Sequence, residues 1–288
     1  MIKTRNSDIH DIWKYSRDIN RLSVHGHSRG SERSGFYIPE LKLCLDAGVQ
    51  MNFEPKHIFI THCHADHSFA LPMILAEIST KPKVYVPKEH SHLFDTFTTS
   101  CHQLSKGSTK TKYKNHSIVG VKTGDTFPVK DNYYVKVYNL DHNVPTRGYG
   151  VFRIKRKLKQ EYTGLSGRDL VLLKRQGIDI DKEVHEHVLA YLCDTTIKPF
   201  NNNADLFMFP DLLVECTFLE SKDDRHANDI DRIKHIHWDI LLHIVKKHPE
   251  VNFHLIHFSD RYQDEYIHDF FKNECEKHEL KNVFPWLN

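Results

Sequence analysis

The sequence predicts a layered α/β protein with a polar site at one edge of a β-sheet. Short apolar runs that are typical of buried strands end on side chains capable of chemistry. Residues 188–193 lead to Asp194, residues 212–214 to Glu215, and residues 253–256 to His257. The apolar positions of residues 230–245 lie between the last two strands at a spacing that predicts an amphipathic helix. Strands that end on such residues fit an α/β architecture with its site at a sheet edge.

The first half of the chain has the same organisation. Residues 41–45 alternate as a half-buried strand and run into a turn at Asp46. Residues 57–60 form a short apolar strand, residues 69–80 predict a helix, and residues 83–86 and 133–140 predict two more strands. We find no internal repeat and no low-complexity linker.

Length and composition indicate one globular domain. A chain of 288 residues suffices for a single large α/β domain, which we expect to span residues 1–288. The net charge of +2 gives no whole-protein argument for binding nucleic acid, so any basic surface must be local. No stretch approaches the roughly 18 apolar residues of a membrane helix, and we expect no membrane partner.

The cysteines predict a reducing compartment. None of the six cysteines forms a CxxC pair, which argues against both a disulfide framework and a cysteine-built zinc site. We therefore expect a cytoplasmic protein, with the nucleus or an organelle left open.

The strongest motif is His62-x-His64-x-Asp66-His67, which lies between the strand at 57–60 and the helix at 69–80. Zinc is bound by imidazole nitrogens and carboxylate oxygens, and a tight loop of this spacing can direct its side chains to two neighbouring ions. A histidine-rich surface loop is the alternative, but such a loop has no reason to lie between two core elements. The motif predicts a metal site.

This motif resembles the HxHxDH signature of the metallo-β-lactamase superfamily, and further segments resemble ribonuclease Z within it. Residues 140–149, 191–195 and 255–262 are similar to its segments around the third-motif histidine, the bridging aspartate and the last histidine ligand. The resemblance covers roughly residues 20 to 265 and implies a single-domain, four-layer αββα sandwich.

The resemblance also implies a ligand set for two zinc ions. By that correspondence His62, His64 and His142 hold one ion, and Asp66, His67 and His257 hold the other. Asp194 bridges the two ions, with a hydroxide as the second bridge, and Asp46 orients ligand histidines. Manganese or iron would also suit these ligands.

The implied reaction is phosphodiester hydrolysis, because two ions can clamp the attacking and leaving oxygens. The segment Val214-Glu215-Cys216-Thr217 resembles the ribonuclease Z glutamate motif, and we expect Glu215 to orient His235 as general acid for the departing 3′ oxygen. Asp66, Glu215 and His235 are thus the expected catalytic residues. His226 and His237 stay open as alternative acids. Glu215 could instead cap a strand, and these histidines could decorate a helix.

RNA contacts are predicted from basic side chains. A short basic insertion at about 153–182 lies between His142 and Asp194 and carries Arg153, Lys155, Arg156 and Lys157. It either forms an arm or lies along the sheet, and a solvated basic face is the alternative. Further candidates are four lysines near residue 110: Lys106, Lys110, Lys112 and Lys114. Ser28 and Arg29 could also contact phosphate, and a purely structural loop is the alternative there.

These observations give three functional hypotheses. The first is a zinc-dependent endoribonuclease that removes the 3′ trailer of precursor tRNA by attack of the metal-bridging hydroxide. The second is a hydrolase of a small phosphodiester such as a cyclic nucleotide. The third, an RNA-binding or scaffold protein without catalysis, predicts an eroded site, but no ligand position is missing. The resemblance further implies a homodimer.

Overall fold

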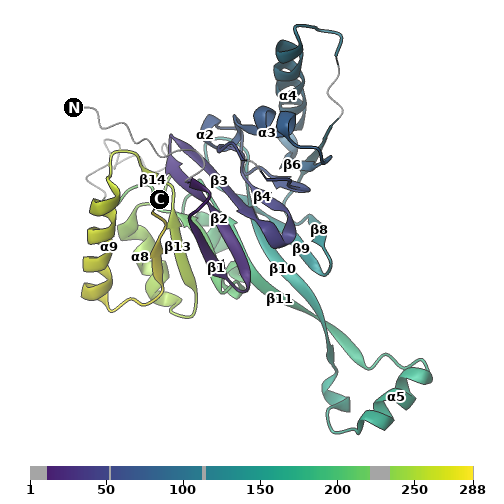
Figure 1. Cartoon of the computed structure of the whole chain (residues 1–288). Helices are drawn as coiled ribbons and strands as arrows, with labels where there is room; N and C mark the ends of the chain where they lie inside the picture. Colours follow the sequence, from purple (N-terminus) through teal and green to yellow (C-terminus); the bar gives the residue numbers. More distant parts are fainter. Residues whose placement is uncertain (1–11, 52, 112–114, 221–233, 288) are drawn as a thin grey trace.

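The computed structural model describes residues 12–51, 53–111, 115–220 and 234–287. Two β-sheets pack face to face and helices cover their outer faces, which confirms the predicted αββα sandwich (Figure 1). The strands of the first sheet are β1 (Ser16–Ile19), β2 (Leu22–Gly30), β3 (Arg33–Ile38), β4 (Leu43–Leu45), β5 (His57–Phe59), β6 (Lys83–Pro87) and β7 (Ser117–Val121), with β14 (Phe258–Ser259) paired to β2. Those of the second sheet, in spatial order, are β15 (Val283–Pro285), β13 (Asn252–Ile256), β12 (Asp211–Glu215), β11 (Asp181–Leu192), β10 (Thr146–Leu158), β9 (Tyr133–Leu140) and β8 (Thr126–Lys130).

Alternating side chains of the strands fill three apolar layers. In β12, Leu213 packs between the sheets, whereas Leu212 and Val214 face the outer helices. In β5, Phe59 packs between the sheets and Ile58 faces the helices of the first sheet. The covering helices are α2 (Ala65–Ser68), α3 (Leu71–Glu77) and α4 (Ser91–Lys106) on the first sheet, and α6 (Lys198–Asn202), α8 (Trp238–Lys247) and α9 (Asp264–His278) on the second.

Two predicted helices are shorter than the sequence pattern indicates. The helix expected at 69–80 becomes α3, which starts at Leu71 with a proline in its first turn and ends at Glu77. The helix expected at 230–245 begins only at Trp238, and the prediction was wrong for residues 234–237, where His237 instead bridges Phe218 as an extended residue. Residues 230–233 lie outside the described ranges.

The basic insertion forms an arm. Strands β10 and β11 extend beyond the second sheet as a long hairpin, and α5 (Gly167–Arg175) lies at its tip (Figure 1). The register runs from Tyr149 opposite Tyr191 to Leu158 opposite Asp181. Ser166 caps α5, because its hydroxyl accepts a hydrogen bond from the Asp169 N–H.

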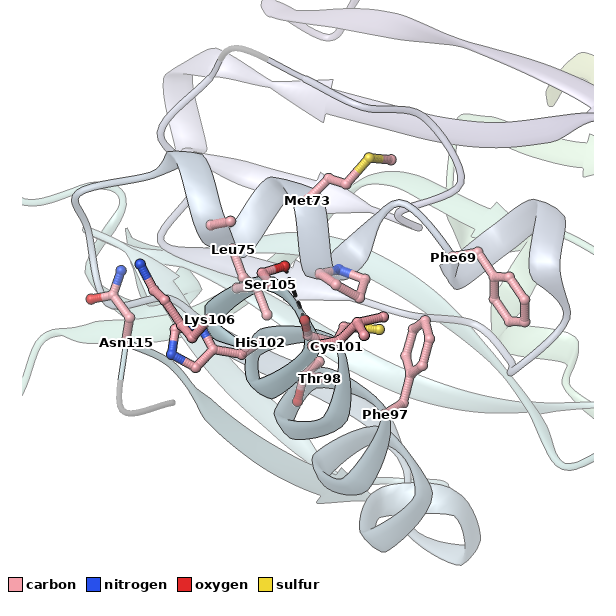
Figure 2. Close-up of a pocket in the computed structure, with 13 residues that line it drawn as sticks. Phe69, Met73, Leu75, Phe97, Thr98, Cys101, His102, Ser105, Lys106 and Asn115 are labelled. Carbon is pink, nitrogen blue, oxygen red and sulfur yellow. Dashed lines mark hydrogen bonds between the residues drawn. The ribbon is translucent and has the colours of Figure 1, made fainter. Parts of the chain in front are cut away.

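Helices α3 and α4 leave an apolar groove of about 700 Å³ between them (Figure 2). Helix α4 stands out from the body, and only Phe94 and Thr98 of its residues are buried. Large apolar side chains on this face are solvent-exposed, with Leu104 84%, Phe69 59% and Met73 48% accessible. We call this surface the α3–α4 face.

Across the described ranges, the helices are too short or too polar for a membrane span.

Candidate metal centre

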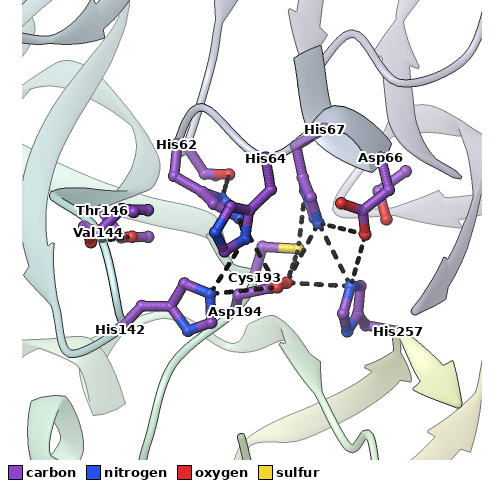
Figure 3. A network of polar contacts seen from close by, with 12 residues as sticks. His62, His64, Asp66, His67, His142, Val144, Thr146, Cys193, Asp194 and His257 are labelled. Carbon is purple, nitrogen blue, oxygen red and sulfur yellow. Dashed lines mark hydrogen bonds and ion pairs between the residues drawn. The ribbon is translucent and has the colours of Figure 1, made fainter. Parts of the chain in front are cut away.

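The seven predicted metal ligands lie together at one edge of the sandwich (Figure 3). Four of them come from the loop after β5 and the first turn of α2, because the chain turns sharply where the strand ends. The others follow the carboxyl ends of strands of the second sheet: His142 after β9, Asp194 after β11 and His257 after β13. The sequence thus correctly indicated which strand ends meet.

One group of ligand atoms comprises His62, His64, His142 and Asp194. The His64 Nδ1 atom lies 3.0 Å from His62 Nε2 and 3.3 Å from His142 Nε2. Asp194 Oδ2 lies 3.7 Å from both His62 Nε2 and His142 Nε2.

The second group comprises Asp66, His67 and His257, to which Asp194 again contributes. The His67 Nε2 atom lies 3.3 Å from His257 Nε2, and Asp66 Oδ2 lies 3.2 and 3.4 Å from these two atoms. Asp194 Oδ1 is 3.3 Å from His67 Nε2 and 3.1 Å from His257 Nε2. Because Oδ1 faces this group and Oδ2 faces the first, the Asp194 carboxylate bridges the two groups.

These spacings fit two divalent ions. Ligand atoms about 2.1 Å from a tetrahedrally coordinated zinc ion lie about 3.4 Å from one another. The contacts in both groups, from 3.0 to 3.7 Å, scatter around that value. The facing nitrogens of His67 and His257 would repel each other as two bare acceptors, whereas a shared cation makes the same approach favourable.

The opposite nitrogen of each ring fixes which nitrogen faces the centre. The Nδ1 atoms of His67, His62 and His142 contact Asp46 Oδ2 at 2.9 Å, Thr61 Oγ1 at 3.0 Å and the Lys234 carbonyl oxygen at 3.1 Å. Each Nδ1–H therefore donates outward and leaves the Nε2 lone pair toward the centre. His64 has the reverse orientation, with Nδ1 toward the centre.

Asp46 is completely buried, and its contact with the His67 ring fits the orienting role predicted for it. Its carboxylate accepts hydrogen bonds from the Thr61 N–H at 2.7 Å, the Thr61 hydroxyl and the Tyr191 hydroxyl at 2.8 Å, besides the His67 ring. So many donors compensate for removing this charge from water.

Burial keeps the first group ready to bind a cation. Desolvation lowers the pKa of His62, His64 and His142, because an imidazolium ion is disfavoured away from water. Neutral imidazole is the form that binds metal, so these rings are competent ligands at neutral pH.

The chain makes room for these ligands at two glycines. A Cβ atom on Gly48 would lie 1.7 Å from the Asp66 carbonyl oxygen, and one on Gly30 would lie 3.3 Å from the His257 ring. His257 itself has φ +63°, a left-handed conformation that is uncommon for a residue with a side chain. Backbone strain of this kind often marks functional sites.

Glu215 and His235 also come together, next to the metal ligands. The His235 Nδ1 atom lies 3.0 and 3.1 Å from the two carboxylate oxygens of Glu215. The His235 ring lies 5.1 Å from the ring of His142 and stacks 5.5 Å from that of His257, measured between centroids. Burial opposes protonation, but the Glu215 carboxylate outweighs it and raises the pKa of His235 to about 9. The ring of His237 instead packs on Phe218, and His226 lies outside the described ranges.

The residues expected to contact RNA divide into buried and exposed ones. Arg29 lies in β2, is buried, forms an ion pair with Asp264 and lies over the Phe258 ring. It therefore has a structural role within the fold rather than a place in a phosphate site. Ser28 is likewise buried and bonds to Ser34.

On the arm, Arg153 and Lys155 both pair with Glu186, and Arg156 pairs with Asp179. Arg156 and Lys157 are exposed. Lys106 and Lys110 are exposed at the end of α4 and in the loop after it, whereas Lys112 and Lys114 lie outside the described ranges.

Four further contributors to the site were missed from the sequence: Thr61, Tyr191, Thr217 and the Lys234 carbonyl. Thr61 and Thr217 each stand within two residues of a predicted functional residue, so proximity along the chain was an available signal. Lys234 directly precedes the predicted His235 and so carried the same signal. Tyr191 contacts Asp46 across 145 positions of the chain, and no local pattern marks that contact.

Comparison with known proteins agrees with this geometry. Residues 30–104 match the family described as the metallo-beta-lactamase superfamily. The solved metallo-beta-lactamase-fold protein YhfI from Bacillus subtilis shares the fold, with a TM-score of 0.55 and 13% identity over 90% of this chain and 93% of that one. The tRNase Z TRZ1 of Arabidopsis thaliana is 29% identical over 89% of this chain and 92% of its own length. The chloroplastic tRNase Z TRZ2 of the same plant is 27% identical over 88% of this chain and 72% of its own.

The chain is a metallo-β-lactamase-fold protein with the donor set of a metal-dependent hydrolase. Its similarity to the plant tRNase Z proteins extends over most of the chain.

Proposed function

We propose that the protein is an endoribonuclease that removes the 3′ trailer of precursor tRNA at a centre of two zinc ions. The observation that carries this proposal is the joint presence of a two-ion ligand set, a carboxylate-oriented histidine beside it and a basic arm. A metallo-β-lactamase fold alone supports only a metal-dependent hydrolase. The Glu215–His235 pair supports phosphodiester cleavage of either a large or a small substrate, and the arm favours RNA.

The metal proposal assigns His62, His64 and His142 to one ion, Asp66, His67 and His257 to the other, and Asp194 to both. Two bound divalent ions would activate water for attack and neutralise charge on the phosphoryl oxygens. Nitrogen and carboxylate donors near tetrahedral spacing favour zinc, and manganese or iron are the alternatives.

The chain itself supplies the proton that the leaving group needs. Glu215 holds His235 through Nδ1 and favours its charged form, so the ring is a proton donor at neutral pH. The His235 side chain is 19% exposed, which leaves it within reach of a substrate bound over the ligands. We propose that His235 protonates the departing 3′ oxygen. Asp66 would contribute to catalysis by holding one metal ion together with His67 and His257.

The arm supplies the proposed RNA-binding surface. Residues 153–182 carry nine Lys and Arg against four Asp and Glu, a net charge of +5 in a chain whose total is only +2. Phosphate groups attract such local positive charge. Arg156 and Lys157 are placed to contact them, and Arg153 and Lys155 would do so by exchanging Glu186 for phosphate.

The length of the arm favours a large substrate over a cyclic nucleotide. Strand β10 begins four residues after His142 and has 13 residues, which span about 40 Å at the usual rise of a strand. A small phosphodiester bound at the metal centre cannot touch the tip of that arm. A structured RNA can contact both.

The test uses the zinc-loaded protein with a 3′-extended precursor tRNA and, in parallel, bis-p-nitrophenyl phosphate. Cleavage at the start of the trailer, lost in His64→Ala, is the expected result. Hydrolysis of the chromogenic diester alone would indicate that the substrate is a small phosphodiester rather than precursor tRNA. If zinc binds but neither substrate is cut, the nuclease proposal fails.

A homodimer is the second part of the proposal, and the α3–α4 face is the surface that supports it. Exposed apolar side chains are concentrated here, with Met73 on α3, Leu104 on α4 and Phe69 just before α3, as at protein interfaces. A two-fold contact would set this face against its own copy, and so each partner would cover the other. Among the described residues that line the groove, Lys106 is the one lysine or arginine, and the apolar side chains suit a protein surface.

Sedimentation would test the dimer. Leu104→Glu combined with Met73→Glu should convert a dimer to a monomer, whereas Leu172→Glu, which changes an exposed leucine on the arm, should not. A wild-type monomer at micromolar concentration would refute this part.

A cytoplasmic location is also proposed, since all six cysteines are free thiols, and fractionation of cells would test it.

A further inference from the structure

The hydroxyl group of Thr217 lies between the metal ligands and the Glu215–His235 pair. Thr217 Oγ1 is 2.5 Å from Glu215 Oε2, 3.1 Å from His257 Nδ1 and 3.3 Å from His235 Nδ1. The side chain is buried, so water does not compete for these contacts. Thr217 therefore touches a ligand of one ion and the group that holds the proposed acid.

Hydrogen-bond accounting fixes the direction of each contact. A hydroxyl has one proton to donate and two lone pairs that accept, whereas a carboxylate only accepts. Glu215 already accepts hydrogen bonds from the Thr195 and Ile236 N–H groups, at 2.6 and 3.1 Å. Both of its oxygens therefore act as acceptors in this structure. The Thr217 proton goes to Glu215, and Thr217 Oγ1 then accepts from the His257 Nδ1–H group.

This direction determines the form of His257. With the proton held on Nδ1, the Nε2 lone pair faces Asp66, His67 and Asp194, as a metal ligand requires. His67 and His142 are backed by a carboxylate and a carbonyl, which accept in every state. His257 is backed by a hydroxyl, which accepts from it only while the hydroxyl proton points elsewhere, and here Glu215 takes that proton.

We infer that Thr217 is a positioning residue that links Glu215 to the metal ligand His257. Its hydroxyl holds His257 in the metal-binding tautomer, and Glu215 sets the direction of that hydroxyl. Glu215 therefore supports the second metal group although its own oxygens are not among the ligands. The link to metal binding stands on hydrogen bonds alone, and only its consequence for catalysis rests on the proposed function.

Substitution of the Thr217 side chain should leave the backbone hydrogen bond of this residue intact. Its carbonyl oxygen accepts from the Ser259 N–H at 3.0 Å, a contact that does not involve the side chain. Thr217→Val removes the hydroxyl at similar size, and Thr217→Ser keeps it. Thr98→Val is the matched control, because Thr98 is also buried and its hydroxyl contacts α4 carbonyls and the His116 ring, all away from the metal ligands.

The primary readout is zinc affinity, measured by competition with a chromogenic chelator. Thr217→Val should weaken one of two zinc equivalents about 10- to 100-fold, whereas Thr217→Ser and Thr98→Val should stay within about threefold. Glu215→Gln should weaken the same equivalent, because its amide can donate to Thr217 and turn the hydroxyl proton toward His257.

The outcome is interpretable without any activity measurement. Thermal unfolding of the metal-free variants shows whether each protein folds. If folded Thr217→Val binds both zinc equivalents as tightly as the wild type, the inference is wrong, whatever the substrate. If zinc affinity changes as expected but no RNA is cut, the inference stands and the proposed function fails.

Discussion

In the metal centre, most ligand histidines are buried and backed by a second hydrogen bond, as His67 is by Asp46. In the arm, by contrast, side chains such as Arg156 and Lys157 are exposed, and the partners of the arm cations are surface carboxylates such as Asp179. The first arrangement holds the ligand side chains in fixed positions. The second presents charge over a long distance and leaves the side chains free to exchange partners.

This difference implies that cutting and holding RNA are separable. Changes in the metal centre should abolish hydrolysis of every substrate, because the chemistry depends on fixed geometry. Changes in the arm should affect large RNA alone, because only a large molecule reaches it. The following variants test that division.

The largest effect is expected from His64→Ala. Loss of one ligand should lower the rate on both precursor tRNA and bis-p-nitrophenyl phosphate about 1,000-fold or more, since it removes stabilisation of the transition state by an ion. Single-turnover rates provide the measurement. His92→Ala, at an exposed histidine on α4, should change neither rate. Loss of activity on only one of the two substrates would contradict the separation between cutting and holding RNA.

Glu215→Gln should lower the rate at neutral pH about 100-fold or more, the usual size of a general-acid contribution. In the wild type the rate should fall as the pH rises through about 9, where His235 loses its proton. In the variant that fall should begin at lower pH, because the carboxylate that raises the pKa of His235 is gone. Superimposable pH profiles would exclude His235 as the acid.

The same pair should make folding stability depend on pH. Because the pKa of His235 is raised from an ordinary value of 6.5 to about 9, the Glu215–His235 pair stabilises the metal-free fold fully below about pH 6.5. That contribution is lost as the pH rises through about 9. Urea denaturation of wild type and Glu215→Gln should converge at high pH, and a constant gap would contradict the pairing.

Shortening the arm should have a smaller and selective effect. Leu158 and Asp181 are paired across the hairpin, so an Asn-Gly turn can join them directly. The shortened protein should bind precursor tRNA about 10- to 100-fold more weakly and hydrolyse the small diester at the wild-type rate. Equal loss on both substrates would mean that the arm supports the metal centre itself.

The smallest effect is expected for Arg156→Ala combined with Lys157→Ala. Each lost phosphate contact should reduce the slope of log affinity against log salt by about one. Lys272→Ala with Lys281→Ala, which changes exposed lysines outside the arm, is the matched control. An unchanged slope in the arm variant would indicate that the ion pair of Arg156 with Asp179 persists in the complex.

The sequence predicted the parts of this protein that are locally encoded. A strand followed by a polar side chain is a short-range pattern, and it correctly indicated where Asp194 and His257 lie. The αββα layers followed from the resemblance. The helix at 230–245 was placed too early because Ile230 and Ile233 continue the apolar spacing of Ile240 toward the N-terminus, whereas α8 begins only at Trp238.

Features that depend on distant segments could not be predicted in this way. The role of Thr217 depends on His257, which is 40 residues further along the chain. Arg29 was a candidate for phosphate because the glycines and serines around it suit a turn, but it lies in β2 and Asp264 from α9 pairs with it. Whether residues 153–182 form an arm depends on the long register between β10 and β11, which composition does not specify.

The central claim is that water attacks the phosphodiester at this centre and that the 3′ oxygen leaves. Cleavage of precursor tRNA in ¹⁸O-enriched water, followed by mass spectrometry of both products, tests it most directly. We predict one ¹⁸O atom in a 5′-phosphate on the trailer and a free 3′-hydroxyl on the tRNA. A 2′,3′-cyclic phosphate without ¹⁸O would contradict the account, because the attacking group would then be the RNA itself.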